Sequence, residues 1–276
     1  MAVLVDITKC IGCGACEVAC KLWNKLPYRK KEDEVRPRQK DDLSDVRWTV
    51  VKRQRLTDAA GERQLRFVKT QCMHCTDPAC VSACFSTALR VDENGAVVYY
   101  PSLCVGCRYC MVACPFKVPR YQWEERFPLI TKCNQCAARL REGKMPACVS
   151  VCPSGALTYG TRDELLARAH ALLAKDARYV DHIYGEHEVG GTNWLYIADQ
   201  PFADLGFAKV TDTPPNAYAQ SYLTKVPIVA GLWALFLVGL SFFHYCREHS
   251  EETKLYHKEC RRHKEEKADK DKEERA

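Results

Sequence analysis

Eighteen cysteines in a chain of 276 residues are the feature that most constrains the fold and chemistry of this sequence. Two of them, Cys246 and Cys260, stand alone near the C-terminus. The other sixteen cysteines lie in four groups of four, called groups one to four: Cys10, Cys13, Cys16 and Cys20; Cys72, Cys75, Cys80 and Cys84; Cys104, Cys107, Cys110 and Cys114; Cys133, Cys136, Cys148 and Cys152. Four copies of one arrangement do not arise by random enrichment, so these groups predict a repeated sulfur site.

The spacing within the groups is typical of iron–sulfur ligation. Groups one and three read C-x2-C-x2-C-x3-C, the run found in bacterial ferredoxins. Groups two and four have an insertion after the second cysteine but keep the final C-x3-C. Three closely spaced thiolates can surround one face of a cubane, and Gly12, Gly14 and Gly106 let the backbone approach it. The fourth cysteine is expected to begin a short helix, and in two-cluster ferredoxins it ligates the other cluster.

Two other chemistries compete with iron–sulfur ligation. A disulfide framework is typical of short secreted chains, and no secretory signal is expected at the start of this sequence. Zinc ribbons also use pairs of C-x2-C, but the tight third cysteine of groups one and three gives poor tetrahedral geometry. The spacing favours iron, and metal analysis separates the two scaffolds: iron with labile sulfide against zinc.

Several polar side chains lie inside the groups but are not expected to be ligands. His74, Arg108 and Tyr109 are interpreted as neighbours of the metal sites. Asn134 and Gln135 are expected to donate hydrogen bonds to cysteine sulfur, which would raise a cluster's reduction potential. The iron ligands are therefore predicted to be the grouped cysteines alone, with Cys246 and Cys260 as bystanders.

The segments between the groups predict an α+β fold. Short strands are expected at 1–7, 47–55, 63–69 and 96–100, the middle two joined by a turn at 58–61. An amphipathic helix is expected at 161–175, with Thr161 as N-cap and Glu164 at the capping-box position. Groups one and three are compact, whereas two and four carry insertions. This pattern indicates duplicated bacterial-ferredoxin-like domains, each with two 4Fe–4S clusters.

Residues 226–246 predict a single C-terminal transmembrane helix. These 21 residues contain no charge, and at helical rise they cross a hydrocarbon core of about 30 Å. A buried core helix of that length normally shows a polar stripe, and here only Ser241 and His244 are strongly polar. The predicted domains are a four-cluster domain at 1–160 with a charged insertion and hairpin at 21–70, an extension at 161–224, the membrane helix at 225–246 and a charged tail at 247–276.

The charge and the remaining motifs argue against two classes of function. The chain has 41 Lys and Arg against 35 Asp and Glu, and basic and aromatic residues do not interleave, so no nucleic-acid partner is expected. A self-contained reductase would need a substrate site or a further cofactor. The sequence has neither a nucleotide-binding glycine fingerprint nor a haem C-x-x-C-H motif. It is therefore expected to carry electrons without a catalytic site of its own.

Five short segments make the sequence resemble a known family. They are Val5-Asp6, Gln71-Cys72-Met73-His74-Cys75, Gly106-Cys107-Arg108-Tyr109-Cys110, Gly190-Gly191-Thr192 and Phe243-His244-Tyr245. The chain resembles the four-cluster iron–sulfur (β) subunits of membrane respiratory oxidoreductases, specifically those of formate dehydrogenase-N and membrane-bound nickel–iron hydrogenase. These belong to a wider superfamily of molybdenum-enzyme electron-transfer subunits. Phe85, where many relatives have proline, and the long charged tail are departures from the family.

The resemblance implies that cysteines from different groups share a cluster. It implies four ligand sets, called quartets one to four, each holding one 4Fe–4S cluster. The quartets are Cys10, Cys13, Cys16 and Cys152; Cys72, Cys75, Cys80 and Cys114; Cys84, Cys104, Cys107 and Cys110; and Cys20, Cys133, Cys136 and Cys148.

The resemblance also implies the partners. Quartets one and four would face a catalytic subunit of the molybdopterin or nickel–iron type, and quartets two and three a membrane cytochrome b or quinone-reducing subunit. An electron-transfer subunit of another molybdopterin oxidoreductase or of a multihaem cytochrome complex is the alternative. Lys and Arg residues are more frequent after the span than before it, which predicts a cytoplasmic tail and a periplasmic cluster domain at the inner membrane. A partner with a twin-arginine signal would carry the folded domain across.

Overall fold

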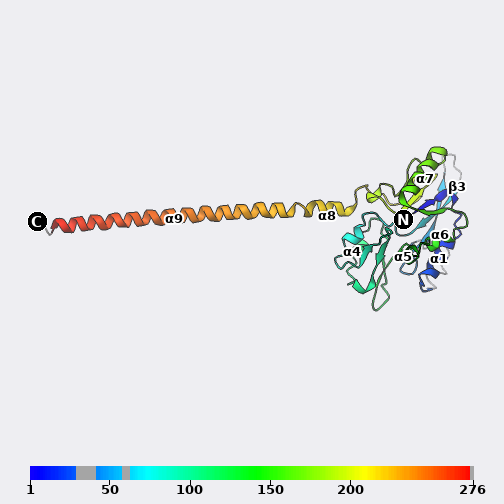
Figure 1. Ribbon diagram of the computed structural model, residues 1–276, viewed down its shortest axis with the longest axis horizontal. Helices are drawn as coiled ribbons and strands as arrows, with labels where there is room; N and C mark the ends of the chain where they lie inside the picture. Colours follow the sequence, from blue (N-terminus) through cyan, green and yellow to red (C-terminus); the bar gives the residue numbers. More distant parts are fainter. Residues whose placement is uncertain (29–41, 58–62, 274–276) are drawn as a thin grey trace. The chain divides into compact units, whose positions relative to one another are not determined.

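The computed structural model describes residues 1–28, 42–57 and 63–273 and divides into two compact units (Figure 1). The first unit is Met1–Tyr218 and the second is Ala219–Ala276. The predicted turn at 58–61 and the charged stretch at 30–34 lie outside the described residues.

A three-stranded sheet in the order β8-β1-β9 forms the centre of the first unit. β1 (Ala2–Asp6) pairs antiparallel with β8 (Leu157–Gly160) and parallel with β9 (Trp194–Ile197). The strand predicted at 1–7 is confirmed. β9 was not predicted, although every one of its side chains is buried. A strand buried on both faces reads as a continuous hydrophobic run without alternation, and this run is only four residues long.

α7 (Arg162–Lys175) covers one face of this sheet. Leu4 of β1 packs in one hydrophobic cluster with Ala169 of α7. The helix begins at the predicted capping box: the Thr161 hydroxyl accepts a hydrogen bond from the Glu164 N–H at 3.4 Å, and the Glu164 carboxylate accepts one from the Thr161 N–H at 3.1 Å. The predicted helix and its N-cap are both confirmed.

Each cysteine group contains a short helix that begins one residue before its third cysteine. These helices are α1 (Ala15–Trp23), α3 (Ala79–Ser82), α4 (Tyr109–Ala113) and α6 (Ala147–Ser150). The expectation that the fourth cysteine begins the helix is wrong, because the C-x3-C spacing itself forms about one helical turn. α1 packs against α6, and α3 packs against α4. Groups one and four therefore form one pair, and groups two and three form a second pair that lies inside it in the sequence.

Short hairpins and single turns connect these helices. The paired strands are β2 (Val50–Thr57) with β3 (Arg63–Thr70), β4 (Leu89–Val91) with β5 (Val97–Tyr99), and β6 (Arg120–Tyr121) with β7 (Ile130–Thr131). The remaining helical segments are η1 (Ile7–Lys9), η2 (Pro101–Leu103), α5 (Ala137–Arg141) and η3 (Glu188–Gly190). The strands predicted at 47–55, 63–69 and 96–100 are confirmed with shifted ends.

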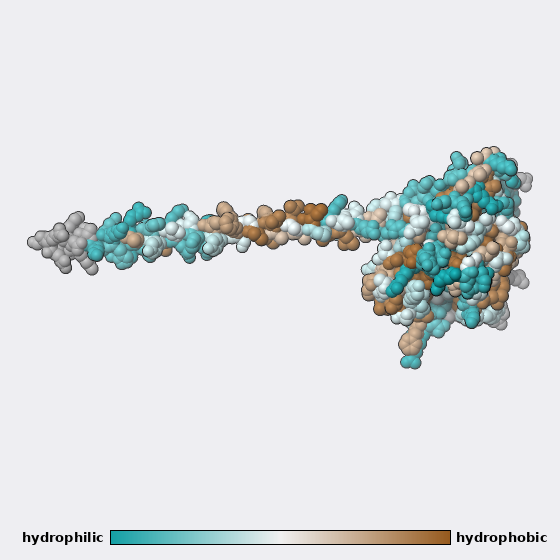
Figure 2. Space-filling view, viewed as in Figure 1, coloured by the Kyte–Doolittle hydropathy of each residue, from teal (hydrophilic) through white to brown (hydrophobic). Residues whose placement is uncertain are grey.

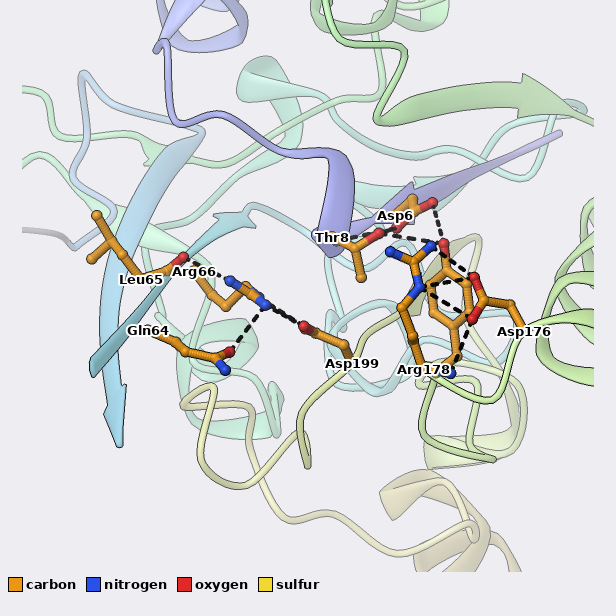
Figure 3. A network of polar contacts seen from close by, with 9 residues as sticks. Asp6, Thr8, Gln64, Leu65, Arg66, Asp176, Arg178 and Asp199 are labelled. Atoms are coloured by element: carbon orange, nitrogen blue, oxygen red, sulfur yellow. Dashed lines mark hydrogen bonds and ion pairs between the residues drawn. The ribbon is translucent and has the colours of Figure 1, made fainter. Parts of the chain in front are cut away.

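A polar network fixes the chain just before the first cysteine (Figure 3). The Asp6 carboxylate accepts hydrogen bonds from the backbone N–H of Thr8 at 3.1 Å and from the Tyr179 hydroxyl at 2.9 Å. Nearby, the Arg66 Nε–H of β3 donates to the carboxylate of Asp199 at 2.9 Å. These contacts join β1 and β3 to the segments on either side of β9, so the start of group one has a fixed position.

The described part of the second unit is almost entirely helical. α8 (Pro215–Leu223) begins in the sequence of the first unit and ends in the second, and it is followed by α9 (Val226–Glu273). Among the described residues, one helix is long and apolar enough to cross a membrane, and it contains the predicted span at 226–246. Figure 2 shows this apolar stretch in brown, followed by the hydrophilic part of the same helix in teal. The helix is continuous across the predicted boundary between span and tail.

Candidate functional site

Two of the expected quartets each line a single cavity. Quartet one lines a cavity together with Gly14, Pro153 and the buried side chain of Lys69. Quartet three lines a second cavity together with Tyr99 and Ile130. In both cavities, one cysteine from another group completes a set of three neighbouring cysteines. Cys10 and Cys152, the first and last cysteines of quartet one, are about 140 residues apart in the sequence and line the same cavity.

The cysteines of the other two quartets are electrostatic neighbours. In quartet two, burial raises the pKa of Cys75, and the Cys72, Cys114 and Cys80 thiols raise it further. Quartet four shows the same effect.

In quartet four, burial raises the pKa of Cys20 to about 12, and Cys148 and Cys136 add to the rise. Burial, followed by the Cys20 thiol, also raises the pKa of Cys133. Thiols that are buried and crowded in this way do not readily lose their protons to become thiolates. They become thiolates when a metal supplies compensating positive charge.

The geometry disfavours both competing uses of the cysteines. All eighteen are free thiols, so they form no disulfide framework. Within the described part of the chain, no three His, Cys, Asp or Glu side chains are close enough to hold a single metal ion, as a zinc site requires. A cubane takes one thiolate on each of its four irons, so its ligands stand farther apart. Cys246 and Cys260 are exposed in α9 and belong to no quartet.

One backbone conformation recurs in all four groups. The residue just before the second cysteine has a positive φ each time: 69° at Gly12, 48° at His74, 71° at Gly106 and 54° at Gln135. This bend turns backbone N–H groups toward sulfur: Gly106 donates to Cys104 Sγ at 3.4 Å, and Gln135 donates to Cys133 Sγ at 3.3 Å. A non-glycine residue in this region costs on the order of 1–3 kcal/mol, and such strain concentrates at functional sites. Successive N–H groups aimed at one point form an anion-binding concavity.

The polar side chains of the groups act differently from the prediction. The Asn134 side-chain oxygen accepts a hydrogen bond from the Cys136 N–H at 2.9 Å, and the Gln135 side chain donates to the Met1 carbonyl at 3.3 Å. Gln135 does donate to sulfur as predicted, but through its backbone N–H to Cys133 Sγ. The prediction is wrong for Asn134, whose side chain accepts a hydrogen bond from the backbone. His74 is fully buried, and its Nδ1 accepts the Val97 N–H at 2.9 Å. Burial lowers the pKa of His74, and two nearby lysines lower it further.

Two buried lysines lie among the quartets, and the sequence reasoning missed them. Lys69 is 2% exposed and Lys132 is 4% exposed. Neither forms a salt bridge with a carboxylate in the described ranges. Burial lowers the pKa of Lys69, but the nearby Cys148, Cys16, Tyr196 and Cys133 side chains outweigh burial and raise the pKa above its usual value. An uncompensated buried charge is strongly unfavourable. The lysines therefore fit a site that holds an anionic, thiolate-ligated cofactor.

The quartets follow one another in a row. Cys16 packs against the hydrophobic cluster that contains Cys148, which links quartet one to quartet four. Cys133 and Cys72 lie in one hydrophobic cluster, which links quartet four to quartet two. Cys80 and Cys110 lie in another, which links quartet two to quartet three. The order is thus one, four, two, three. The two end quartets each contain one exposed thiol, Cys13 and Cys107, whereas no cysteine of the two middle quartets is exposed.

Comparison with known proteins identifies the family. Two family models, both described as a 4Fe–4S dicluster domain, match residues 9–88 and 63–162. The iron–sulfur subunit of the nitrate-inducible formate dehydrogenase of Escherichia coli is 37% identical over 260 residues, which cover 89% of this chain and 84% of that protein. This chain belongs to that family of iron–sulfur subunits. Its cofactor is therefore of the 4Fe–4S type, and the predicted α+β fold of duplicated two-cluster domains is confirmed.

Two further relatives support the assignment. The hydrogenase-2 operon protein HybA of Escherichia coli is 35% identical over 276 residues, covering 85% of this chain and 83% of that protein. A protein of Nitratidesulfovibrio vulgaris is 48% identical over 243 residues, covering 86% of this chain and 65% of that protein. The chain therefore spans less than two thirds of the length of the N. vulgaris relative.

Proposed function

We propose that this protein relays electrons, one at a time, along four 4Fe–4S clusters held by quartets one to four. The observation that carries the proposal is the row of quartets with one exposed cysteine at each end. A relay needs an accessible site for the donor, an accessible site for the acceptor and protected sites between them. Quartets one and three supply the ends, and quartets four and two supply the middle.

The proposed ligands are the sixteen grouped cysteines, shared as the quartets divide them. Each cluster supplies a centre that accepts and releases one electron. The chain's own residues would hold these centres in sequence and exclude water from the middle two. Backbone N–H groups, such as those of Gly106 and Gln135, would donate to ligating sulfur and stabilise added negative charge.

The proposed partners stand at the two ends of the row. The family names of the relatives support a catalytic subunit of formate dehydrogenase or hydrogenase type next to quartet one. A membrane cytochrome b or quinone-reducing subunit would stand next to quartet three. In the alternative assembly, the catalytic partner belongs to another molybdopterin oxidoreductase or to a multihaem cytochrome complex. The chain itself would perform no bond chemistry in either case.

The assembly would be anchored in the inner membrane by the apolar part of α9. We propose that the cluster domain is periplasmic and the tail cytoplasmic, because Lys and Arg are more frequent after the span. Six of them follow it within about 20 residues, whereas Lys209 and Lys225 precede it. Protease added to intact spheroplasts should digest the cluster domain and spare the tail. A fully protected cluster domain would reverse the orientation.

The relay itself is tested on the membrane complex purified through a tag on this chain. Formate or hydrogen should reduce its iron–sulfur signals under anaerobic conditions, and a soluble quinone should reoxidise them. Reduction by dithionite but by neither formate nor hydrogen would favour the alternative assembly. Signals that dithionite reduces and quinone cannot reoxidise, in a complex that retains its membrane subunit, would contradict the relay.

A further inference from the structure

Lys69 is a buried cation placed between two quartets. Its ammonium donates hydrogen bonds to Thr49 Oγ1 and to Gln71 Oε1, both at 2.7 Å, and lies 4.4 Å from the centre of the Trp194 ring. These partners are neutral, so they solvate the charge without cancelling it. Lys69 also lines the cavity of quartet one. Its positive charge lowers the pKa of Cys16, whose main shift is a rise caused by burial.

The same charge also acts on quartet four. The Lys69 ammonium lies over the Trp194 ring, and Trp194 packs in one hydrophobic cluster with Cys148 of quartet four, against which Cys16 of quartet one also packs. The charge also lowers the pKa of Cys20, against the larger rise caused by burial. Lys69 therefore faces quartets one and four together, at the point where the row passes from one to the other.

Lys132 occupies a comparable position beside quartet two. Its ammonium donates to the backbone carbonyls of Val97 and of Cys133, the latter at 2.8 Å. These carbonyls leave its charge uncancelled. Val97 packs in one hydrophobic cluster with Cys80 of quartet two. Lys132 also lowers the pKa of Cys80 and Cys114, both of quartet two, against the larger rise caused by burial.

We propose that Lys69 sets the reduction potentials of the clusters in quartets one and four, and that Lys132 sets that of quartet two. Transfer of one electron from the donor to a cluster adds one negative charge there, and no bond forms or breaks. A fixed positive charge in a poorly solvated interior stabilises that added charge strongly. Both lysines therefore raise the potentials of their clusters. This inference rests on the proposed four-cluster relay.

The test is a redox titration followed by electron paramagnetic resonance, with the full-length, cluster-loaded protein. In Lys69→Met, two of the four centres should become harder to reduce, each by at least tenfold in the equilibrium constant, which is 59 mV for one electron. In Lys132→Met, one centre should shift in the same direction. Lys69→Arg should keep all four potentials, because the charge is retained. Lys52→Met is the matched control, since Lys52 is partly exposed and pairs with Asp42 at 3.0 Å, and it should leave all four unchanged.

Other patterns overturn the inference. It fails if Lys69→Met shifts no centre, shifts all four alike or raises the potentials. Iron content is measured on every variant, and Lys69→Gln is titrated if Lys69→Met loses iron. If both neutral variants lose the iron of two clusters, the lysine holds the clusters rather than setting their potentials, and the inference is wrong. Failure of the relay proposal is seen separately, in wild-type protein that lacks four reducible centres.

Discussion

The sharing of cysteines between groups makes a quantitative prediction for α1, which carries Cys16 and Cys20 one helical turn apart. Cys20 is 7% exposed and has Cys148 and Cys136 as thiol neighbours, whereas Cys16 lies in the cavity of quartet one. Substituting either cysteine by alanine should therefore remove a different cluster. Each single variant should fall from about sixteen to about twelve iron atoms per chain, because one of four four-iron clusters is lost.

Double variants decide which cysteines share a cluster without any spectral assignment. Cys20→Ala combined with Cys133→Ala should retain about twelve iron atoms, because both substitutions affect one four-iron cluster. Cys16→Ala combined with Cys20→Ala should retain about eight, because two such clusters are lost. The assay is iron per chain after anaerobic purification. The reverse pattern would refute the reasoning and assign Cys20 to the cluster of its own group.

Three further predictions concern stability. Gly12→Ala places a Cβ in steric conflict with the Phe67 ring, at a φ of +69°. It should lower the free energy of unfolding, measured in urea, by more than the control Gly143→Ala does. At Gly143 the φ is +71° and an added Cβ meets no atom within 4 Å, so that variant should cost only the backbone strain of about 1–2 kcal/mol. Equal losses of stability in the two variants would exclude the Phe67 contact. Thr161→Ala should cost about 1 kcal/mol through the lost N-cap of α7, and no change in the same assay would contradict that cap. Removing the clusters with a chelator under oxidising conditions should lower the thermal midpoint of the first unit. The drop should be smaller in Lys69→Met, because the cluster-free wild type buries an uncompensated ammonium and the variant does not. An equal or larger drop in Lys69→Met would contradict this charge argument.

Local patterns predicted much of the fold because they act over a few residues. The capping box at Thr161 and Glu164 needs only four consecutive residues, and the structure contains it. The cysteine spacing likewise predicted four equivalent groups, and the recurrent positive φ before each second cysteine shows that the groups share one backbone path. β9 was missed because its pairing with β1 joins segments about 190 residues apart, which no local periodicity reveals.

The charges of the site were the main feature that the sequence did not predict. In β3, the alternation of side chains along a strand places Lys69 on the same face as Phe67. From its sequence, β3 is therefore expected to be an ordinary half-exposed strand. The structure buries the end of this strand on both faces, because the cysteine groups cover it. A lysine in an apolar strand that leads directly into a cysteine group is the one signal that would have pointed to this role. The hydrogen bonds of Asn134 and Gln135 depend on side-chain rotamers that the spacing does not fix.

The central claim is that sixteen cysteines hold four 4Fe–4S clusters, and elemental analysis of the anaerobically purified chain tests it most directly. Iron and acid-labile sulfide should each approach about sixteen per chain, with zinc far below one equivalent. Values near eight for iron and sulfide would mean that only two quartets hold clusters. Stoichiometric zinc without labile sulfide would contradict the account altogether.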